Sequence, residues 1–297
     1  MLDTRLTEHR NARSERIDRL SPLEISNLIN AEDQQVARAV GEEREAIAAA
    51  MTMVVDSFRR GGRLFYVGAG TSGRLGVLDS AEMPPTFGTD PEMVQGIIAG
   101  GYAALVRAQD GAEDFPESGA EALDERGVTE RDFVLGIATS GTTPFVHGAL
   151  ARAREVGART GFLLCTHPSP ELLEAHDVVI AHLVGPEVIT GSTRMKAGTA
   201  TKLVLNTITT GAMVLLGKVL GNLMVVLQVT CQKLQDRGER ILMVTLDADR
   251  ETARDLLEEA GGSVKTAIVM GRLGVSREEA EERLEEADGV ISRLLEN

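Results

Sequence analysis

The sequence contains no tryptophan, and aromatic residues of all kinds make up only 3% of its 297 residues. Proteins that bind single-stranded nucleic acids stack the bases on aromatic side chains, and this chain has few to offer. Positive charge is also in the minority, since 31 lysines and arginines stand against 45 acidic residues, for a formal net charge of −14. Nucleic acids bind through clusters of positive charge. Both shortages therefore argue against a nucleic-acid partner.

Cysteine is scarce as well. Cys165 and Cys231 are the only two, and each lies among apolar residues. This is typical of a reduced, cytoplasmic protein and not of a disulfide scaffold. The five histidines have no spacing suited to metal ligation and no cysteine pair beside them, so we predict no metal site.

Long apolar runs are absent with one exception. The first twenty residues are charged and have no apolar core, so we expect no signal peptide. The segment Leu203–Val229 is long enough to span a membrane, but polar residues and glycines interrupt it and Lys218 lies near its middle. We therefore predict a buried core or subunit-interface helix in a soluble protein, with no membrane partner.

Most of the chain alternates between short apolar runs and helical patterns. Short, continuous, apolar strands separated by helices indicate a parallel sheet that is covered on both faces. The fold class predicted is therefore α/β, a three-layer α/β/α sandwich with a five-stranded, mostly parallel sheet. The expected strands are Arg63–Val67, Val94–Ala99, Asp132–Ala138, Thr160–Cys165 and Val178–Ala181, and the helices between them are Arg74–Glu82, Glu113–Arg126, Pro144–Val156 and Glu171–Ala175.

We divide the chain into an N-terminal helical arm (residues 1–60), the α/β domain (61–238) and a small C-terminal helical module (239–297). In the arm, Ser21-Pro-Leu-Glu24 is a capping box that starts a helix, and a second helical pattern runs over residues 32–60 with a break at Gly41. After Asp249 the glycines predict three short helices. This module carries no recognisable site chemistry.

Three loops rich in glycine and hydroxyl residues are candidates for a binding site. They are Gly68-Ala-Gly-Thr-Ser-Gly-Arg74, Ala138-Thr-Ser-Gly-Thr-Thr-Pro144 and Thr190-Gly-Ser-Thr-Arg-Met-Lys196, of which the first two directly follow strands. Ligands of open α/β sheets bind at the carboxyl ends of the strands, where these loops would meet. Free N–H groups and hydroxyls there suit a phosphate. The predicted phosphate-binding residues are Gly70, Thr71, Ser72, Gly73, Arg74, Ser140, Gly141, Thr142, Thr143, Ser192, Thr193 and Lys196.

The first loop also matches a dinucleotide-binding fingerprint, Gly68-x-Gly70-x-x-Gly73. Such a site needs an acidic residue at the end of the second strand. That strand ends Gly96-Ile-Ile-Ala-Gly-Gly101, without an acid, and the chain has no Walker A lysine motif. We therefore expect no dinucleotide cofactor.

Two glutamates follow the first loop and form a candidate acid/base pair. Glu82 precedes Met83-Pro-Pro85, and we expect the prolines to end the helix and hold this carboxyl at a corner. Glu113 lies at a predicted helix start, in Asp110-Gly-Ala-Glu-Asp114. The residues alone leave a second interpretation open, in which Glu113 only offsets a helix dipole and Glu82 is a surface charge.

The longest motifs resemble those of the N-acetylmuramic acid 6-phosphate etherases, whose fold is the sugar isomerase (SIS) domain. They are Phe65–Gly88, Gln95–Gly100, Gly111–Asp114 and Val184–Ala200, and the likeness reaches from Thr7-Glu-His-Arg-Asn11 to a helical tail similar to a ubiquitin-associated region. The resemblance implies a cytoplasmic lyase of cell-wall recycling without a cofactor. It would cleave the lactyl ether of its phosphorylated amino sugar to give N-acetylglucosamine 6-phosphate and D-lactate. Glu82 matches the family's proton donor, and Glu113 its second active-site residue.

The sequence departs from the family pattern at two places, and two other functions compete with that of an etherase. Thr142 stands where many relatives carry arginine, and Val225-Val226 and Cys231-Gln232-Lys233 stand where relatives tend to carry more polar or acidic residues. A sugar-phosphate isomerase would use the same domain, and a non-catalytic sugar-phosphate-sensing regulator would need only the binding loops. The long apolar helix favours a homodimer whose site borrows residues from its neighbour.

Overall fold

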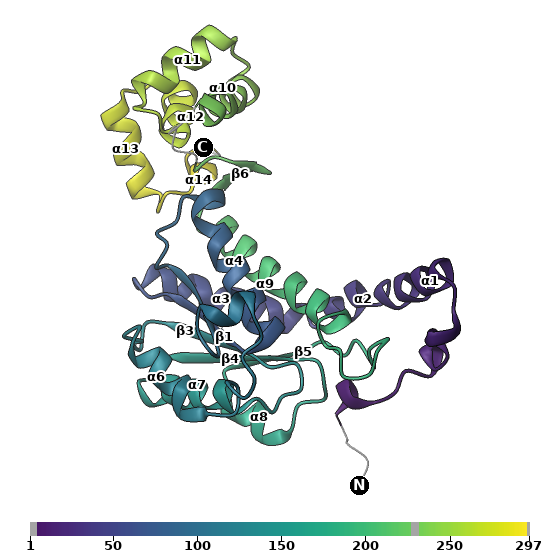
Figure 1. Ribbon diagram of the computed structural model, residues 1–297. Helices are drawn as coiled ribbons and strands as arrows, with labels where there is room; N and C mark the ends of the chain where they lie inside the picture. Colours follow the sequence, from purple (N-terminus) through teal and green to yellow (C-terminus); the bar gives the residue numbers. More distant parts are fainter. Residues whose placement is uncertain (1–4, 227–231, 296–297) are drawn as a thin grey trace. The chain divides into compact units, whose positions relative to one another are not determined.

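The computed structural model describes residues 5–226 and 232–295 and contains a five-stranded sheet in which every strand is parallel to its neighbours. The strand order is β2-β1-β3-β4-β5, so β1 pairs with β2 on one side and with β3 on the other, and the order of the strands changes direction at β1 (Figure 1). The predicted fold class is confirmed. The strands are β1 Leu64–Gly68, β2 Val94–Ile98, β3 Phe133–Ile137, β4 Arg159–Leu164 and β5 Val178–Ala181, each within a residue or so of its predicted bounds.

Helices cover both faces of this sheet. In Figure 1, α6 (Pro116–Asp124), α7 (Pro144–Glu155) and α8 (Pro170–Ala175) lie on one face, and α3 (Arg44–Arg59), α4 (Gly70–Phe87) and α9 (Lys196–Leu215) lie on the other. Strand residues alternate between the two layers. Phe65 and Val67 belong to the core on the α6–α7 side, whereas Tyr66 packs against Gly76 of α4. Because both faces are buried, the strands read as continuous apolar runs and not as alternating ones.

Helix α4 corrects one expectation. It was predicted to stop before the prolines, but it runs through Pro84 and Pro85 and ends at Phe87, where Gly88 takes a left-handed φ of +59° and donates to the Pro84 carbonyl. Pro84 and Pro85 have no N–H donors and so remove hydrogen bonds only from the last turns of the helix. Glu82 therefore lies on the side of a continuous helix and not at a corner.

The N-terminal part forms three short 3₁₀ turns followed by helices. The capping box at Ser21 is confirmed, with its hydroxyl accepting from the Glu24 N–H and the Glu24 carboxylate accepting from the Ser21 N–H. The break in the second helical pattern falls at Glu43 and not at Gly41. The elements are η1 Leu6–Glu8, η2 Ala12–Ser14, η3 Ile17–Arg19, α1 Pro22–Asp33, α2 Val36–Glu42 and the helix α3 given above.

The long apolar segment is a shorter helix than predicted. Helix α9 ends at Leu215, and Gly217 and Gly221, both with positive φ, turn the chain into the small hairpin of β6 (Val219–Leu220) and β7 (Leu223–Met224). The end of the predicted segment, together with Cys231, lies outside the described residues. Within residues 5–226 and 232–295, no helix combines the length and the apolar character that crossing a membrane requires.

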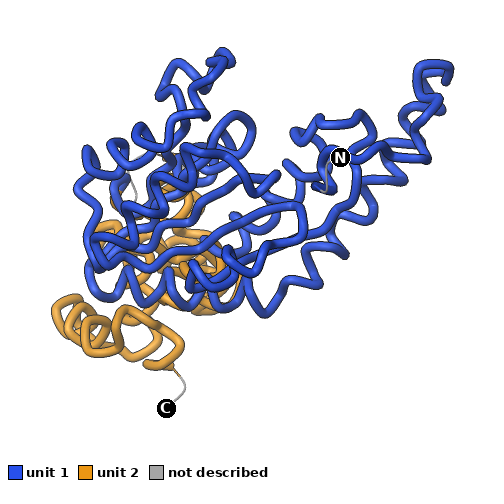
Figure 2. Tube along the Cα trace, turned by 90° about the horizontal axis from the view of Figure 1, so that it is seen from below, with its two compact units in different colours: residues 1–82, 91–209 blue, residues 83–90, 210–297 orange. Residues whose placement is uncertain are grey.

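The chain divides into two compact units, residues 1–82 with 91–209 and residues 83–90 with 210–297 (Figure 2). The second unit has its own core, built largely from the packing of its helices. The three short helices predicted after Asp249 are present, and a fourth follows them. The helices are α10 Gln232–Leu246, α11 Arg250–Glu259, α12 Val264–Leu273, α13 Arg277–Glu286 and α14 Ile291–Leu295. The earlier division at residues 60 and 238 stays a prediction.

Close packing in the first loop leads to a prediction on stability. A Cβ added to Gly73 would lie 2.6 Å from Ile98 Cγ1 and 2.7 Å from the backbone oxygen of Gly68. Gly73→Ala should therefore lower the free energy of unfolding by about 1–3 kcal/mol, because the backbone contact cannot yield. At Gly41 in α2, a Cβ would meet nothing within 4 Å. Gly41→Ala should instead stabilise by about 0.5–1 kcal/mol. Urea unfolding of both variants measures the contrast, and equal effects would contradict it.

Candidate active site

A polar cavity of about 450 Å³ lies at the carboxyl ends of β1 and β3. The connections from these two strands lead to helices on opposite faces of the sheet, and the point where they diverge is where open α/β sheets bind ligands. The cavity therefore occupies the place that the sheet topology assigns to a site. Its lining consists of Arg5, Glu8, Ala69, Gly70, Thr71, Ser72, Glu113, Asp114, Ile137, Ala138, Thr139, Ser140, Thr142, Thr143, Pro144, Gly191 and Thr193.

The first predicted loop supplies one wall through the N-terminus of α4. Gly70 takes a φ of +53°, which turns the chain from β1 directly into the helix, and Gly70, Thr71 and Ser72 form its first turn. N–H groups in a first turn have no acceptor within their own helix, and the helix dipole is positive at this end. This wall is built to receive an anion.

The second loop supplies hydroxyl groups. Gly141 adopts a φ of +78° and its N–H donates to the Ala138 carbonyl, which folds the loop into a tight turn. Within the turn, Ser140 Oγ and Thr142 Oγ1 are 3.0 Å apart, and both side chains line the cavity. Thr143 is the residue before α7 and makes no side-chain capping bond. Its hydroxyl joins the others as a group for a polar ligand.

The third loop takes part only through Gly191 and Thr193. The N-terminus of α9 behind it is already occupied, since the carboxylate of Glu187 accepts from the N–H groups of Lys196 and Ala197 at 3.1 and 2.9 Å. Burial raises the pKa of Glu187, and these N–H groups oppose that rise. Ser192, although predicted, is not among the residues that line the cavity.

Lys196 also lies elsewhere. Its side chain is only 2% exposed, and Nζ is 2.7 Å from Oε2 of Glu32, which is 4% exposed. Asn11 donates to the same carboxylate and Arg13 pairs with it. Although burial opposes the change, these partners lower the pKa of Glu32. The lysine predicted to bind substrate thus joins the N-terminal region to α9.

Gly73 and Arg74 surround the site without lining this cavity. Gly73 allows α4 to approach β1 and β2, as described above. Arg74 donates to the carbonyls of Leu105 and Ala104 at 3.0 and 2.6 Å, and so holds the short helix α5 (Ala103–Val106) in place. Its side chain also lines a neighbouring cavity of about 250 Å³, which shares Gly70 and Glu113 with the larger one.

Glu113 lies in the cavity, but not in a helix as predicted. It belongs to a turn, and α6 begins three residues later at Pro116. A proline at the first helical position explains the later start. The Glu113 carbonyl accepts from the N–H of Phe145 in α7 at 3.0 Å, so its backbone is tied to the same helix that carries the second loop. Glu113 therefore lines the cavity from a backbone that is tied to α7.

Glu82 is absent from this cavity. It lies on α4 twelve residues beyond Gly70, which corresponds to about 18 Å along the helix axis. Its side chain is exposed on the far half of the helix. Of the two predicted catalytic carboxyls, only that of Glu113 belongs to a residue that lines this cavity.

Sequence reasoning missed the N-terminal contribution. Arg5 and Glu8 both line the cavity, and Arg5 Nη1 donates to Thr142 Oγ1 at 3.3 Å. The N–H of Leu6 donates to Thr166 Oγ1, which fixes this segment beside the end of β4. Glu8 lies in the motif from Thr7 to Asn11, but no local pattern in that motif places the segment beside the cavity.

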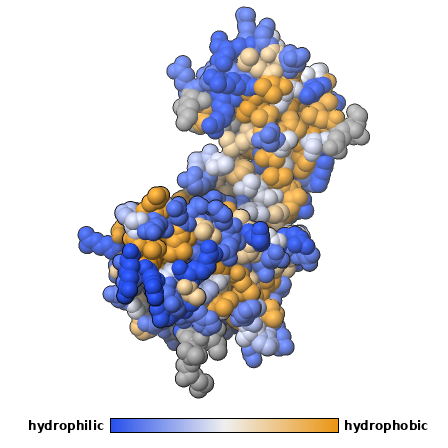
Figure 3. Space-filling model, turned by 90° about the vertical axis from the view of Figure 1, so that its right-hand side faces the viewer, coloured by the Kyte–Doolittle hydropathy of each residue, from blue (hydrophilic) through white to orange (hydrophobic). Residues whose placement is uncertain are grey.

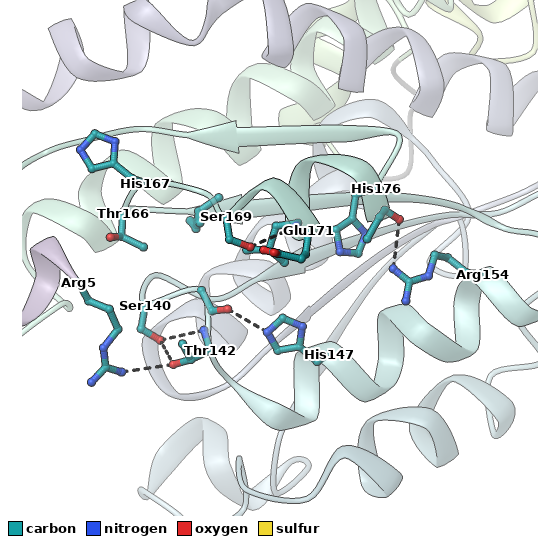
Figure 4. Close-up of a pocket in the computed structure, with 14 residues that line it drawn as sticks. Arg5, Ser140, Thr142, His147, Arg154, Thr166, His167, Ser169, Glu171 and His176 are labelled. Carbon is teal, nitrogen blue, oxygen red and sulfur yellow. Dashed lines mark hydrogen bonds between the residues drawn. The ribbon is translucent and has the colours of Figure 1, made fainter. Parts of the chain in front are cut away.

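A second cavity of about 490 Å³ adjoins the first and shares Arg5, Ser140 and Thr142 with it (Figure 4). His147 and His176 flank Phe162 there, each ring centroid 5.4 Å from that of the phenylalanine. Burial, with the nearby charges of Arg154 and His147, lowers the pKa of His176 to about 4, so this ring is neutral at physiological pH. In residues 5–226 and 232–295, no cluster of three or more histidine, cysteine or acidic side chains is arranged to hold a metal ion.

The chain is similar to a family model, to curated proteins and to solved structures. The model of the glucokinase regulatory protein N-terminal SIS domain matches residues 46–154. N-acetylmuramic acid 6-phosphate etherase from Salinibacter ruber is 57% identical over 265 residues, which is 89% of this chain and 85% of the relative. The etherase from Synechococcus elongatus is 55% identical over 264 residues, or 89% of this chain and 86% of the relative. Among solved structures, a phosphoheptose isomerase from Francisella tularensis superimposes with a TM-score of 0.51 at 18% identity, covering 65% of this chain and 98% of that one, which shows the shared fold.

Proposed function

The chain belongs to the N-acetylmuramic acid 6-phosphate etherase family, and we propose that it is a carbon–oxygen lyase that cleaves the D-lactyl ether of N-acetylmuramic acid 6-phosphate. The products are N-acetylglucosamine 6-phosphate and D-lactate, in the recycling of cell-wall sugars in the cytoplasm. The observation that carries the proposal is identity above 50% to curated etherases over 89% of the chain. The cavity is consistent with it, because an anion-binding wall and a carboxyl group face the same space.

The sugar phosphate has a natural position in this cavity. Its phosphate oxygens accept from the first-turn N–H groups of α4 and from the hydroxyls of Thr71, Ser72, Ser140 and Thr142. Arg5 adds a positive charge to the cavity, and its guanidinium group donates a hydrogen bond to Thr142 Oγ1. With the phosphate held here, the sugar extends toward Glu113.

The reaction needs one acid and one base. Opening of the sugar ring exposes an aldehyde, which acidifies the hydrogen on the neighbouring carbon. A base removes that proton, the bond from the next carbon to the lactyl oxygen breaks, and an acid gives the departing oxygen a proton. Water then adds across the carbon–carbon double bond. In the proposal Glu113 is the base, Glu82 is the acid that protonates lactate and later activates water, and no cofactor takes part.

The test is the release of D-lactate. Purified protein is mixed with N-acetylmuramic acid 6-phosphate, and D-lactate is measured with an enzyme specific for that stereoisomer. A sugar-phosphate isomerase would convert aldose to ketose and release no lactate, and a regulator would bind the sugar without turnover. Binding without D-lactate release would overturn the proposed activity.

His147 is expected to position the second loop. Its Nε2 lies 2.9 Å from the Gly141 carbonyl, and because that oxygen only accepts, the ring must donate. His147→Phe keeps the contact with Phe162 but loses the hydrogen bond. KM should rise about 3–10-fold with little change in kcat, since one hydrogen bond contributes about 1 kcal/mol. His176→Phe is the matched control, because it changes the other histidine that packs against Phe162 and leaves the hydrogen bond to Gly141 intact. An equal rise in KM for both variants would contradict this role.

A further inference from the structure

The polar cavity at the carboxyl ends of β1 and β3 carries more negative charge than a phosphate site needs. Among its described lining residues, the charged ones are Arg5, Glu8, Glu113 and Asp114, so three carboxyl groups stand against one guanidinium group. Because like charges repel, each carboxylate weakens the binding of a bare phosphate. The proposed reaction gives a task to Glu113, but it leaves Glu8 without one.

Glu8 follows Arg5 by one turn of 3₁₀ helix. The N–H of Glu8 donates to the Arg5 carbonyl at 3.0 Å. Side chains three residues apart in such a turn lie on the same side of it, about 6 Å apart along its axis. Thr7, between them, is only 2% exposed. The turn therefore presents a positive group and then a negative group to the same cavity.

Hydrogen bonds to distant parts of the chain hold this turn in place. The N–H of Leu6 donates to Thr166 Oγ1 at 3.3 Å, and Ser14 Oγ donates to the Val188 carbonyl at 2.7 Å. Hydrophilic residues cover much of the surface of the first unit on the side where α1 lies in Figure 1 (Figure 3). Polar contacts thus fix the two charged groups in the cavity wall.

The Glu8 carboxylate lies against the third loop. A Cβ added to Gly191 would be 3.6 Å from Glu8 Oε2, and Thr7 Oγ1 donates to Glu8 Oε1 at 3.3 Å. A carboxylate can accept about four hydrogen bonds, so the bond from Thr7 orients this group and leaves it able to accept from a ligand.

The substrate has the matching pair of groups. In N-acetylmuramic acid 6-phosphate, C2 carries the acetamido group, C3 carries the lactyl ether and C5 carries the ring oxygen. The hydroxyl nearest the phosphate is therefore that of C4. Phosphate oxygens accept from N–H and guanidinium groups, whereas a hydroxyl can donate to a carboxylate. A cation followed after about 6 Å by a carboxylate suits a phosphate ester with a hydroxyl a few bonds away.

We propose that Glu8 is a specificity-determining residue, a role that rests on the proposed function. Its carboxylate accepts a hydrogen bond from the C4 hydroxyl of the sugar while Arg5 and the N-terminus of α4 hold the phosphate. Glu8 then has opposite effects on two ligands. It stabilises a bound sugar phosphate, whose hydroxyl pairs with it, and it opposes inorganic phosphate, which it only repels.

Calorimetric titration of the Glu8→Ala variant tests the proposal. The Kd of N-acetylglucosamine 6-phosphate should rise about 10–100-fold, as expected for the loss of a hydrogen bond to a charged group. The Kd of inorganic phosphate should instead fall about 2–10-fold, because the repulsion is removed. Glu8→Gln keeps an oxygen acceptor without the charge, so it should lose less affinity for the sugar phosphate. A structural defect would weaken both ligands. Weaker binding of both, or of neither, would overturn the proposal.

A sugar without the C4 hydroxyl identifies the partner of Glu8. Wild-type protein should bind 4-deoxy-N-acetylglucosamine 6-phosphate about 10–100-fold more weakly than the parent sugar phosphate. Glu8→Ala should not weaken the binding of the deoxy compound, because the hydrogen bond is already missing. An equal loss from Glu8→Ala with both sugars would show that the C4 hydroxyl is not the partner and would overturn the proposal.

Asp114→Asn is the matched control, because it removes another carboxylate from the same cavity. Its Kd for N-acetylglucosamine 6-phosphate should stay within about threefold of the wild-type value. A loss as large as that of Glu8→Ala would mean that the net charge of the cavity decides affinity, and would contradict a specific role of Glu8. These titrations need no turnover. A protein that binds as expected but releases no D-lactate would overturn the proposed activity and leave the role of Glu8 supported.

Discussion

Glu113→Gln should lower the rate of D-lactate release by about 10²–10⁴-fold, the usual contribution of a general acid or base. Glutamine keeps the size of the side chain and its place in the turn, and the carbonyl of residue 113 still accepts from Phe145. Only the ability to take a proton is lost. The effect should therefore appear in kcat, measured by D-lactate release at saturating substrate, while the KM for the sugar phosphate stays nearly unchanged.

Asp114→Asn is the matched control for this variant. Asp114 is the next residue in the same turn, lines the same cavity and is also exposed, so the substitution removes an equal charge at nearly the same place. Its kcat should stay within about threefold of the wild type, a change of less than about 1 kcal/mol. A similar loss in both variants would mean that the net charge of the cavity matters and that Glu113 has no specific role.

Lys196→Met should produce the largest loss of stability, about 3–5 kcal/mol in the free energy of unfolding. The ammonium group is buried 2.7 Å from Glu32, and without it a carboxylate stays buried with Asn11 and the half-exposed Arg13 as its remaining partners. The loss should be visible as a lower urea midpoint. Lys202→Met changes an exposed lysine of the same helix. It should shift the urea midpoint by only a small fraction of the shift that Lys196→Met causes.

The origin of this loss can be checked in two ways. Adding Glu32→Leu to Lys196→Met removes the unpaired charge, so the double variant should recover part of the stability. The difference between wild type and Glu32→Gln should also depend on pH. Because the pKa of Glu32 is lowered in the folded protein, its contribution is full above the ordinary value of 4.5 and is lost as the pH falls through the lower folded value. A pH-independent difference would contradict the ion pair as its cause.

Local sequence signals predicted the sheet well. Strands such as β1 and β3 are short and apolar, and because they are buried on both faces they can be recognised without knowledge of their partners. Helix ends were less predictable. Pro84 and Pro85 favour a helix end, yet α4 continues to Phe87, because the missing donors affect only its last turns. The predicted end at Glu82 is therefore five residues short of the observed end at Phe87.

The candidate site was predictable where it follows the sheet topology. Gly70, Thr71 and Ser140 come directly after strands, so the parallel order of the strands brings them together. Lys196 was beyond prediction, since nothing near it in the sequence identifies Glu32 as its partner. Arg5 and Glu8 were missed for the same reason, because contacts between distant segments leave no periodic pattern in the chain.

The N-terminal segment that lines the cavity also bears on the order of folding. Leu6, Asn11 and Ser14 hydrogen-bond to Thr166, to Pro186 and to Val188, at sequence separations of 160, 175 and 174 residues. During synthesis this segment leaves the ribosome well before its hydrogen-bond partners, which are made more than a hundred residues later. Closing so long a loop costs entropy that only the finished sheet can offset. We therefore expect this edge of the cavity to form among the last steps of folding, after the strands on which it rests.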